Sequence, residues 1–401
     1  MAASAIRAFV FVCICLLFSS STSYYDPDLE LYKEILELNG LRDQYFRSSS
    51  EDYDDYRSQD YIFNVDLLMP NITPEHINDY KCYSVPTPED LSVFIVGFQA
   101  QALEGTAHHI LLFGCEEPGS DEEVWDCGEM DTEGKDQSTP CNGWPRILYA
   151  WAMNAPPMKL PDGVGFEIGG ATRIRHLVLQ IHYASVAKFQ DGTKDTSGLT
   201  LTVTNVPQRY KAGTYFMGAD GKIPAKSEVK LETACIYDEE PRLVPFAFRV
   251  HAHSLGNVIS GYRVRDEQWT EIGKQDPTLP QMFYPVENDA LDIEYGDVLA
   301  ARCTMENPRD KTVFIGPTMD DEMCNFYMMY YTESEHLPEN DICFNGAGFK
   351  WSDYLENIPD KEASEMPKKQ KEDKSSEEGS MEMKMDSGEE KEDNEEKGRD
   401  E

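Results

Sequence analysis

Short apolar runs separated by turn residues fill the middle of the chain, from Tyr61 to Leu355. The runs are rich in Val, Ile, Tyr and Phe, and Gly, Pro and Asp lie between them, which is typical of β-strands. No long apolar stripe with helical spacing interrupts this pattern. Closely spaced short strands favour antiparallel sandwiches or jelly rolls, so we predict an all-β protein with two β-sandwich (jelly-roll) domains. The strands are expected at 92–97, 109–113, 176–181, 199–203, 245–250, 298–301 and 326–331.

Composition divides the rest of the chain. The stretch 189–198 is polar and turn-rich, so we expect one domain at 61–190 and a second at 191–356. Residues 24–60 are dense in Asp, Glu, Ser and Tyr and are expected to form an acidic arm or pro-segment. Residues 357–401 have almost no aliphatic side chains, so burial cannot offset the entropy of ordering them, and we expect a disordered acidic tail.

The N-terminus has the parts of a secretory signal peptide at 1–23. Arg7 precedes an apolar run at 8–18, and small residues follow at 19–23. The run is too short to span a bilayer, which takes about 20 apolar residues. We therefore expect a protein of the secretory pathway, in the granule lumen or secreted, with no transmembrane segment.

Cysteine usage and a glycosylation sequon agree with export. Two of the ten cysteines lie in the predicted signal. The other eight are an even number in an exported chain, which predicts four disulfides. Asn71-Ile-Thr is a glycosylation sequon.

The chain has 74 acidic and 36 basic side chains and a net charge of −38, which argues against nucleic-acid binding because no basic surface would neutralise phosphates.

Arg249-Val-His-Ala-His contains the first candidate metal ligands. Side chains alternate along a strand, so Arg249, His251 and His253 share one face. Two imidazoles about 7 Å apart on one face can converge on one metal ion. The same spacing also suits two histidines that are satisfied by ordinary hydrogen bonds.

His108 and His109 form a second candidate cluster. Adjacent residues on a regular strand face opposite ways, so both can bind one ion only at a strand end or an irregularity, which the nearby Gly105 makes plausible. His182 is a third candidate ligand, and three histidines with an open position suit zinc or copper equally. His176 is interpreted as a solvated or hydrogen-bonding histidine.

Met323 could discriminate between the two metals. Alternation places Met323, Asn325 and Tyr327 on one face of a strand, and a thioether ligand favours copper, particularly Cu(I). A single methionine is nevertheless more often core filler. Spacing does not establish where this face lies relative to the histidines.

Seven segments together resemble the copper type II, ascorbate-dependent monooxygenase family, which includes peptidylglycine α-hydroxylating monooxygenase and the dopamine and tyramine β-monooxygenases. Trp-Ala-Met-Asn-Ala-Pro-Pro at 151–157 resembles the peptide-amidating branch more than the catecholamine branch. The resemblance covers about 66–343. It is carried by residues 108–115, 148–157, 163–170, 179–183, 248–253, 261–265 and 321–327.

The resemblance implies two copper ions in two domains separated by a water-filled cleft. The first domain would hold an electron-transfer copper, with Tyr80 and Gln180 nearby, and the second a catalytic copper. Arg249, Asn325 and Tyr327 would bind the carboxylate of a C-terminal glycine. The implied copper ligands are His108, His109 and His182 in the first domain and His251, His253 and Met323 in the second.

The resemblance also implies the reaction and the disulfide pairing. With ascorbate as reductant and O₂ as co-substrate, the protein would hydroxylate the Cα of C-terminal glycine in peptides, the first step of neuropeptide and hormone amidation. We expect a monofunctional form that depends on a separate lyase. Ala252 replaces the Thr of many relatives, and Thr196 replaces a Cys of vertebrate relatives. The implied pairs are Cys82–Cys127, Cys115–Cys141, Cys235–Cys343 and Cys303–Cys324.

Two other functions stay open at this point. A phenylethylamine hydroxylase of the dopamine or tyramine type should place an acidic residue near the catalytic copper to bind the amine, whereas this sequence offers Arg249. An acidic metal-buffering or calcium-storage protein of the secretory pathway would explain the charge. It would not explain a ligand set rich in histidine.

Overall fold

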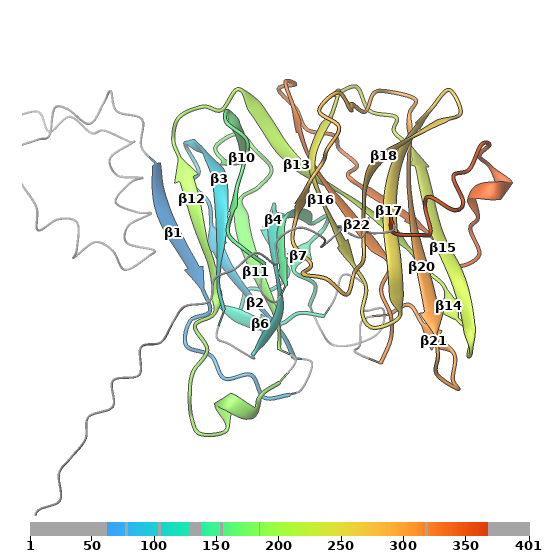
Figure 1. Ribbon diagram of the computed structural model, residues 1–401. Coiled ribbons are helices and arrows are strands. Elements are labelled where there is room, and N and C mark those ends of the chain that lie inside the picture. The colour runs from blue at the N-terminus through green and yellow to red at the C-terminus, as the bar shows by residue number, and fades with distance from the viewer. Residues whose placement is uncertain are drawn as a thin grey trace, which may run out of the picture. The chain divides into compact units, whose positions relative to one another are not determined.

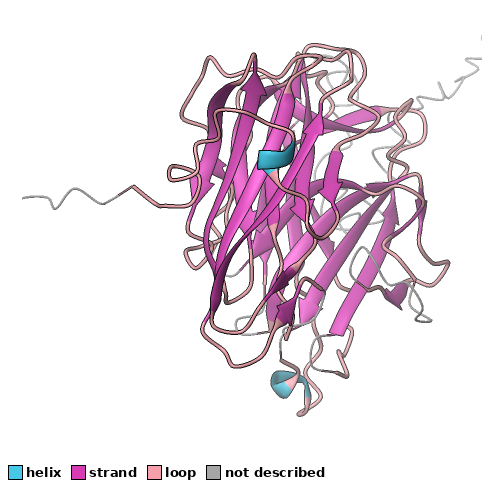
Figure 2. Cartoon of the chain, turned by 90° about the vertical axis from the view of Figure 1, so that its right-hand side faces the viewer, coloured by secondary structure: helices cyan, strands magenta, loops and turns pink. Residues whose placement is uncertain are grey.

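Strands make up nearly all the regular structure that the computed structural model describes (Figure 2). The described residues are 62–76, 79–102, 106–128, 138–152, 155–183, 185–316 and 320–367. Within them the helices are two 3₁₀ turns, η1 (Ala187–Phe189) and η2 (Trp351–Asp353), and none is long and apolar enough to cross a membrane. The all-β prediction is confirmed. The predicted signal peptide and acidic arm lie outside the described residues.

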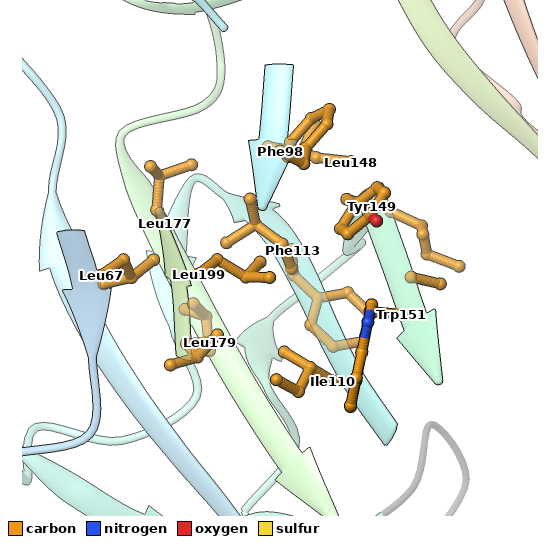
Figure 3. Close-up of a cluster of buried hydrophobic side chains, with 14 of the residues drawn as sticks. Leu67, Phe98, Ile110, Phe113, Leu148, Tyr149, Trp151, Leu177, Leu179 and Leu199 are labelled. Atoms are coloured by element: carbon orange, nitrogen blue, oxygen red, sulfur yellow. The ribbon is translucent and has the colours of Figure 1, made fainter. Parts of the chain in front are cut away.

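The first sandwich packs a five-stranded sheet against part of a larger one (Figure 1). Phe98, Phe113 and Leu179 are among the large side chains that fill the space between the two layers (Figure 3). The five-stranded sheet has the order β6 (Val124–Asp126), β2 (Asp79–Pro86), β11 (His176–Tyr183), β4 (Ala107–Cys115) and β8 (Arg146–Ala152). The opposing layer contains β1 (Ile62–Leu68), β12 (Gly198–Thr204), β3 (Ser92–Gln101) and β10 (Val164–Gly169), with β9 (Met158–Lys159) beside β3; β5 (Glu117–Pro118) and β7 (Cys141–Asn142) form a separate small pair.

The second sandwich repeats this design with its own core. Phe248, Val250 and Phe326 belong to that core. One layer contains β13 (Tyr210–Ala219), β22 (Asn325–Thr332), β16 (Val244–His251) and β19 (Tyr284–Pro285), with β23 (Ile342–Asn345) beside β13. The other has the order β15 (Ser227–Ile236), β20 (Val298–Asn307), β17 (Gly256–Arg265) and β18 (Gln268–Gln275); β14 (Lys222–Ile223) and β21 (Val313–Phe314) form a small pair.

The two sandwiches are joined through backbone and side chains. Strands β10 and β13 pair in parallel at Val164↔Tyr210, so one layer of each sandwich belongs to a continuous ten-stranded sheet. The Arg146 guanidinium of the first sandwich also forms an ion pair with the buried Asp341 carboxylate of the second, at 3.1 Å. These links hold the ends of β4, β11 and β16, where the histidines lie, close to one another.

The change from one sandwich to the other comes later in the chain than the expected boundary at 190/191. Strand β12, at 198–204, pairs with both β1 and β3 and therefore belongs to the first sandwich. The polar stretch at 189–198 is a loop within that sandwich, since turn residues mark loops inside a domain as readily as loops between domains. The second sandwich begins with β13 at Tyr210.

Residues 357–366 pack on the second sandwich, although we expected disorder from residue 357. Ala363 is completely buried, and its carbonyl oxygen accepts a hydrogen bond from the Ser260 hydroxyl at 2.9 Å. The Lys274 ammonium group donates to the Glu362 carbonyl oxygen at 2.7 Å. Composition alone does not predict this packing, because backbone carbonyl oxygens, which every residue has, make part of the contacts.

The structure forms the four disulfides that the resemblance implies. Two lie in the first sandwich and two in the second. The sequon residue Asn71 is exposed, just after β1, so a glycan there would meet solvent. Glycosylation of Asn71 stays a prediction.

Candidate metal centres

The first histidine cluster lies where β4 and β11 pair. His182 lies directly opposite His109, but the next residue, Tyr183, pairs with Ala107, so His108 is the extra residue of a β-bulge. A bulge lets two adjacent side chains escape strict alternation. It is therefore the irregularity that adjacent histidine ligands require.

The three imidazoles form a compact set of possible ligands. One nitrogen from each of His108, His109 and His182 lies within 4.8 Å of the others. The ring centroids of His109 and His182 are 4.7 Å apart, and the ring of Tyr80 stacks on His182 with a centroid separation of 4.3 Å. Gln180 is buried on the same strand, where its amide donates to the Gly128 carbonyl oxygen.

The protonation state of this cluster suits metal binding. Burial lowers the pKa of His182 to about 3 and lowers the pKa values of His108 and His109 as well, so all three rings are neutral near pH 7. The Nδ1 atoms of His108 and His109 are buried and have no hydrogen-bond partner among the described residues. Buried ring nitrogens that lack a donor or acceptor are available to a metal ion, so the cluster fits copper.

The second cluster lies at the end of β16. The ring centroids of His251 and His253 are 5.4 Å apart. The Nδ1 atom of His251 is hydrogen-bonded to the Gln281 side-chain oxygen, and that of His253 to the Asp321 carbonyl oxygen at 3.0 Å. With each Nδ1 held as a donor, the Nε2 atom of each ring is left as a possible metal ligand.

Met323 lies two residues before β22, whose first residue pairs with His251 at the end of β16. Asn325 lies opposite His251, and Tyr327 lies opposite Arg249, so the two faces that the sequence analysis treated separately are neighbours in one sheet. The Asn325 amide donates to the Met323 sulfur at 3.7 Å and to the Tyr327 hydroxyl at 3.4 Å. A thioether beside two imidazoles is a donor set that fits copper.

Glu322 ties the two ligand-bearing segments together. Its carboxylate is completely buried and accepts hydrogen bonds from three backbone N–H groups, those of His253 at 2.6 Å, Leu255 at 2.7 Å and Met323 at 3.0 Å. The carboxylate therefore fixes the backbone of His253 relative to that of Met323. The sequence analysis missed both Glu322 and Gln281, because their contacts join segments that are far apart in the chain.

Arg249 is a buried cation beside the second cluster. Its side chain is 2% exposed, its Nε–H donates to the Gln281 carbonyl oxygen at 2.9 Å, and its guanidinium lies 5.2 Å from the centre of the Tyr327 ring. Burial lowers its pKa, and the nearby Tyr327 and Tyr149 oppose this effect. No acidic side chain in the described ranges forms an ion pair with Arg249, so the site can accept an anion.

The two clusters adjoin each other in this structure. The ring centroids of His109 and His251 are 5.9 Å apart, and the rings are nearly perpendicular. The resemblance implied a water-filled cleft between the clusters. Here the imidazoles of the two sandwiches are in direct contact at this point.

Comparison with known proteins identifies the family of this chain. Residues 65–190 match the model of the copper type II ascorbate-dependent monooxygenase N-terminal domain, and residues 210–350 match that of its C-terminal domain. The chain belongs to the copper type II ascorbate-dependent monooxygenase family. It is an oxidoreductase that uses copper and ascorbate.

The chain is similar to peptidyl-glycine alpha-amidating monooxygenases and, at lower identity, to a dopamine beta-hydroxylase. The chain is 43% identical over 310 residues to peptidyl-glycine alpha-amidating monooxygenase of Mus musculus, and this match covers 77% of the chain and 30% of that protein. The Rattus norvegicus protein is 45% identical over 277 residues, covering 68% and 27%. Dopamine beta-hydroxylase of Equus caballus is 26% identical over 290 residues, covering 68% and 47%.

The chain spans about a third of the length of the peptidyl-glycine monooxygenases that it matches. Among solved structures, allantoicase aligns with 59% of this chain and 78% of its own at a TM-score of 0.18 and 11% identity, which is too low to bear on fold or function.

Proposed function

We propose that this protein hydroxylates the Cα of C-terminal glycine in peptides, using two copper ions, ascorbate and O₂. The buried Arg249 beside His251, His253 and Met323, which forms no ion pair with the described residues, is the observation that carries this proposal. A guanidinium binds a carboxylate strongly through charge-assisted hydrogen bonds. A C-terminal glycine held by its carboxylate would present its Cα to the neighbouring ligand set.

The residues of the second cluster would have three roles: binding the substrate carboxylate, positioning the metal ligands, and ligating copper. Arg249 would bind the carboxylate, with the Tyr327 hydroxyl and the Asn325 amide as further polar contacts. Gln281 and Glu322 hold the ligand side chains and backbone in place, and such outer contacts preserve ligand geometry. His251, His253 and Met323 would hold the catalytic copper, which supplies oxygen activation when it is bound.

The first cluster would hold the copper that passes on electrons from ascorbate. The pKa values of His108, His109 and His182 are low enough that protons do not compete with copper for the ring nitrogens. The neutral imidazoles suit both oxidation states of copper. The contact between the rings of His109 and His251 provides a short path between the two centres. This arrangement supports a two-copper reaction.

A phenylethylamine hydroxylase is the second candidate, and the charges argue against it. An amine substrate needs a nearby carboxylate, and the Glu322 carboxylate beside the second cluster is already bonded to three backbone N–H groups. The metal-buffering alternative leaves the buried Arg249 unexplained. Four disulfides support a route through the secretory pathway, and we propose that a separate lyase converts the hydroxylated product to the amide.

Ascorbate consumption by the copper-loaded protein tests this function. We expect a glycine-extended peptide to stimulate consumption, and phenylethylamine and the same peptide with a C-terminal amide to leave it near background. Stimulation by phenylethylamine alone would identify an amine hydroxylase. Tight copper binding with no substrate-dependent consumption would favour metal buffering.

A further inference from the structure

A cavity of about 300 Å³ lies between the two layers of the first sandwich, beside β1. This volume is at the lower end of the range found for binding pockets. Strand β1 contributes Phe63, Val65 and Leu67 to the wall, and β2 contributes Tyr83 and Val85. The wall is therefore formed mainly by apolar and aromatic side chains.

The cavity is open because both layers end beside it. Among the described residues β1 pairs only with β12 and forms the outer edge of its layer (Figure 1). In the other layer, β6 pairs with residues 81–83 of β2 and leaves 84–86 without a neighbour on that side. Alternation turns Phe63, Val65 and Leu67 toward the opposing layer, and Leu67 is 2% exposed. Phe63 and Val65 remain partly exposed, so the apolar inner face of β1 loses its cover toward the start of the strand.

Two polar residues of the wall, Thr87 and Asp66, already have hydrogen-bond partners. The Thr87 hydroxyl donates to the Ile174 carbonyl oxygen at 2.8 Å, and the Asp66 carboxylate accepts a bond from the Thr200 hydroxyl at 2.5 Å. Alternation also turns Asp66 to the outer face of β1. The cavity therefore favours an apolar occupant, whose burial contributes about 25 cal/mol per Å² of apolar surface.

The preceding part of the chain enters the first sandwich at this opening. The described structure begins at Ile62, which is next to Phe63 in the cavity wall. Residues 29–38, which lie outside the described residues, contain an apolar stripe in an otherwise acidic arm. Residues 39–61 can span at most about 75 Å, so this stripe can reach any part of the cavity.

The spacing within 29–38 predicts a short amphipathic helix. Polar side chains recur with helical spacing at 30, 33, 34 and 37, and the remaining positions are apolar. Asn39-Gly40 follows, which is a typical helix end. A helix of about ten residues is marginal by itself in water and needs a surface on which to bury its apolar face. The apolar residues are Leu29, Leu31, Tyr32, Ile35, Leu36 and Leu38.

We propose that the apolar face of residues 29–38 docks into this cavity and closes the open edge of the first sandwich. The helix and the cavity each lack a packing partner, and the helix is tethered beside the opening. It therefore meets the cavity at a high effective concentration, which a free partner would have to exceed. Leu177 in the cavity wall precedes His182 by five residues, about 17 Å along β11. Docking should therefore stabilise the sandwich without contact to the proposed copper ligands.

Hydrogen exchange of the full chain from residue 24, with two matched pairs of variants, tests the proposal. Ile35→Asp puts a charge on the apolar face, and Lys33→Gln makes the same change of net charge on the polar face. Phe63→Asp puts a charge in the cavity wall, and Asn64→Asp puts one on the exposed outer face of β1. The amides of residues 33–38 should be protected in the wild type. Ile35→Asp and Phe63→Asp should each speed their exchange tenfold or more, and the two controls less than threefold.

Val65→Ala is a milder change in the wall and should speed exchange at 33–38 in the same direction, so the test does not depend on the folding of Phe63→Asp. Unprotected amides at 33–38 in the wild type would overturn the proposal. Protection that the changes at Phe63 and Val65 leave unaltered would also overturn it, because the helix would then dock elsewhere. Protection that appears only at concentrations where sedimentation shows a dimer would assign the cavity to a second copy of the chain and overturn docking within one chain.

Discussion

Replacing Glu322 by Gln should damage the second metal centre while sparing the first. The carboxylate accepts three backbone N–H groups, and bonds to a charged acceptor contribute about 1.5–3 kcal/mol each. A neutral amide of the same shape keeps one acceptor oxygen and turns its NH₂ group toward at least one N–H. The buried donor that is left without an acceptor costs about 1–3 kcal/mol, and the surviving bonds weaken.

We therefore expect Glu322→Gln to lose about 3 kcal/mol of stability. At about 2–4 °C per kcal/mol, the melting temperature should fall by roughly 6–12 °C. Loss of a contact that orients metal ligands typically weakens metal binding by about 10–100-fold. Because Glu322 holds His253 and Met323 but none of the ligands on β4 or β11, only one of the two coppers should be lost.

Thermal unfolding and a copper titration against a competing chelator measure both effects on the same sample. Glu287→Gln is the control, since Glu287 is exposed and the substitution has the same chemistry. A Glu322→Gln protein with the wild-type melting temperature and two coppers of unchanged affinity would refute this account of Glu322. Equal weakening at both copper sites would point to general unfolding instead.

Three further substitutions or truncations test other parts of the account. Met323→Ala should keep the fold and one copper but nearly abolish turnover, and wild-type turnover in this variant would remove Met323 from the site. Arg249→Ala should raise the peptide KM by tenfold or more, because the carboxylate loses its charged partner; an unchanged KM would contradict carboxylate recognition. Truncation after Asp360 should lower the melting temperature by several degrees relative to truncation after Pro367, since only the shorter chain lacks the buried Ala363; equal melting temperatures would show that 361–367 adds no stability.

Strand alternation predicted which residues share a face but not which faces meet. It placed Arg249 with His251, and Asn325 with Tyr327, and the structure has both pairs on the faces expected. That β16 and β22 are neighbours depends on the order of strands in the sheet. Strand order is a long-range property that local spacing does not contain, and only the resemblance grouped Met323 with His251 and His253 before the structure was known.

The bulge at His108 shows the same limit at a smaller scale. The sequence indicated that adjacent histidines need an irregular strand, and Gly105 made one plausible. Which residue is extra depends on how β4 pairs with β11, and only the structure shows this register. Glu322 was harder to foresee, because its role is to bind backbone N–H groups, which every sequence has.

Two polar segments differ in the structure from what their composition predicts. Composition marked 357–366 as unable to fold, yet Ala363 is buried and its neighbours bond through backbone atoms that composition does not report. The stretch 189–198 looked like a boundary between domains, but β12 returns after it to complete the first sandwich. Both errors come from contacts between a polar segment and a distant strand.

Incorporation of oxygen from ¹⁸O₂ into a glycine-extended peptide tests the central claim most directly. With copper and ascorbate present, the account predicts a product that contains one ¹⁸O atom on the Cα of its C-terminal glycine, as mass spectrometry with fragmentation would show. The same peptide with a C-terminal amide should remain unlabelled, because it offers no carboxylate to Arg249. No label in the glycine-extended peptide, or equal labelling of the amidated one, would contradict the account.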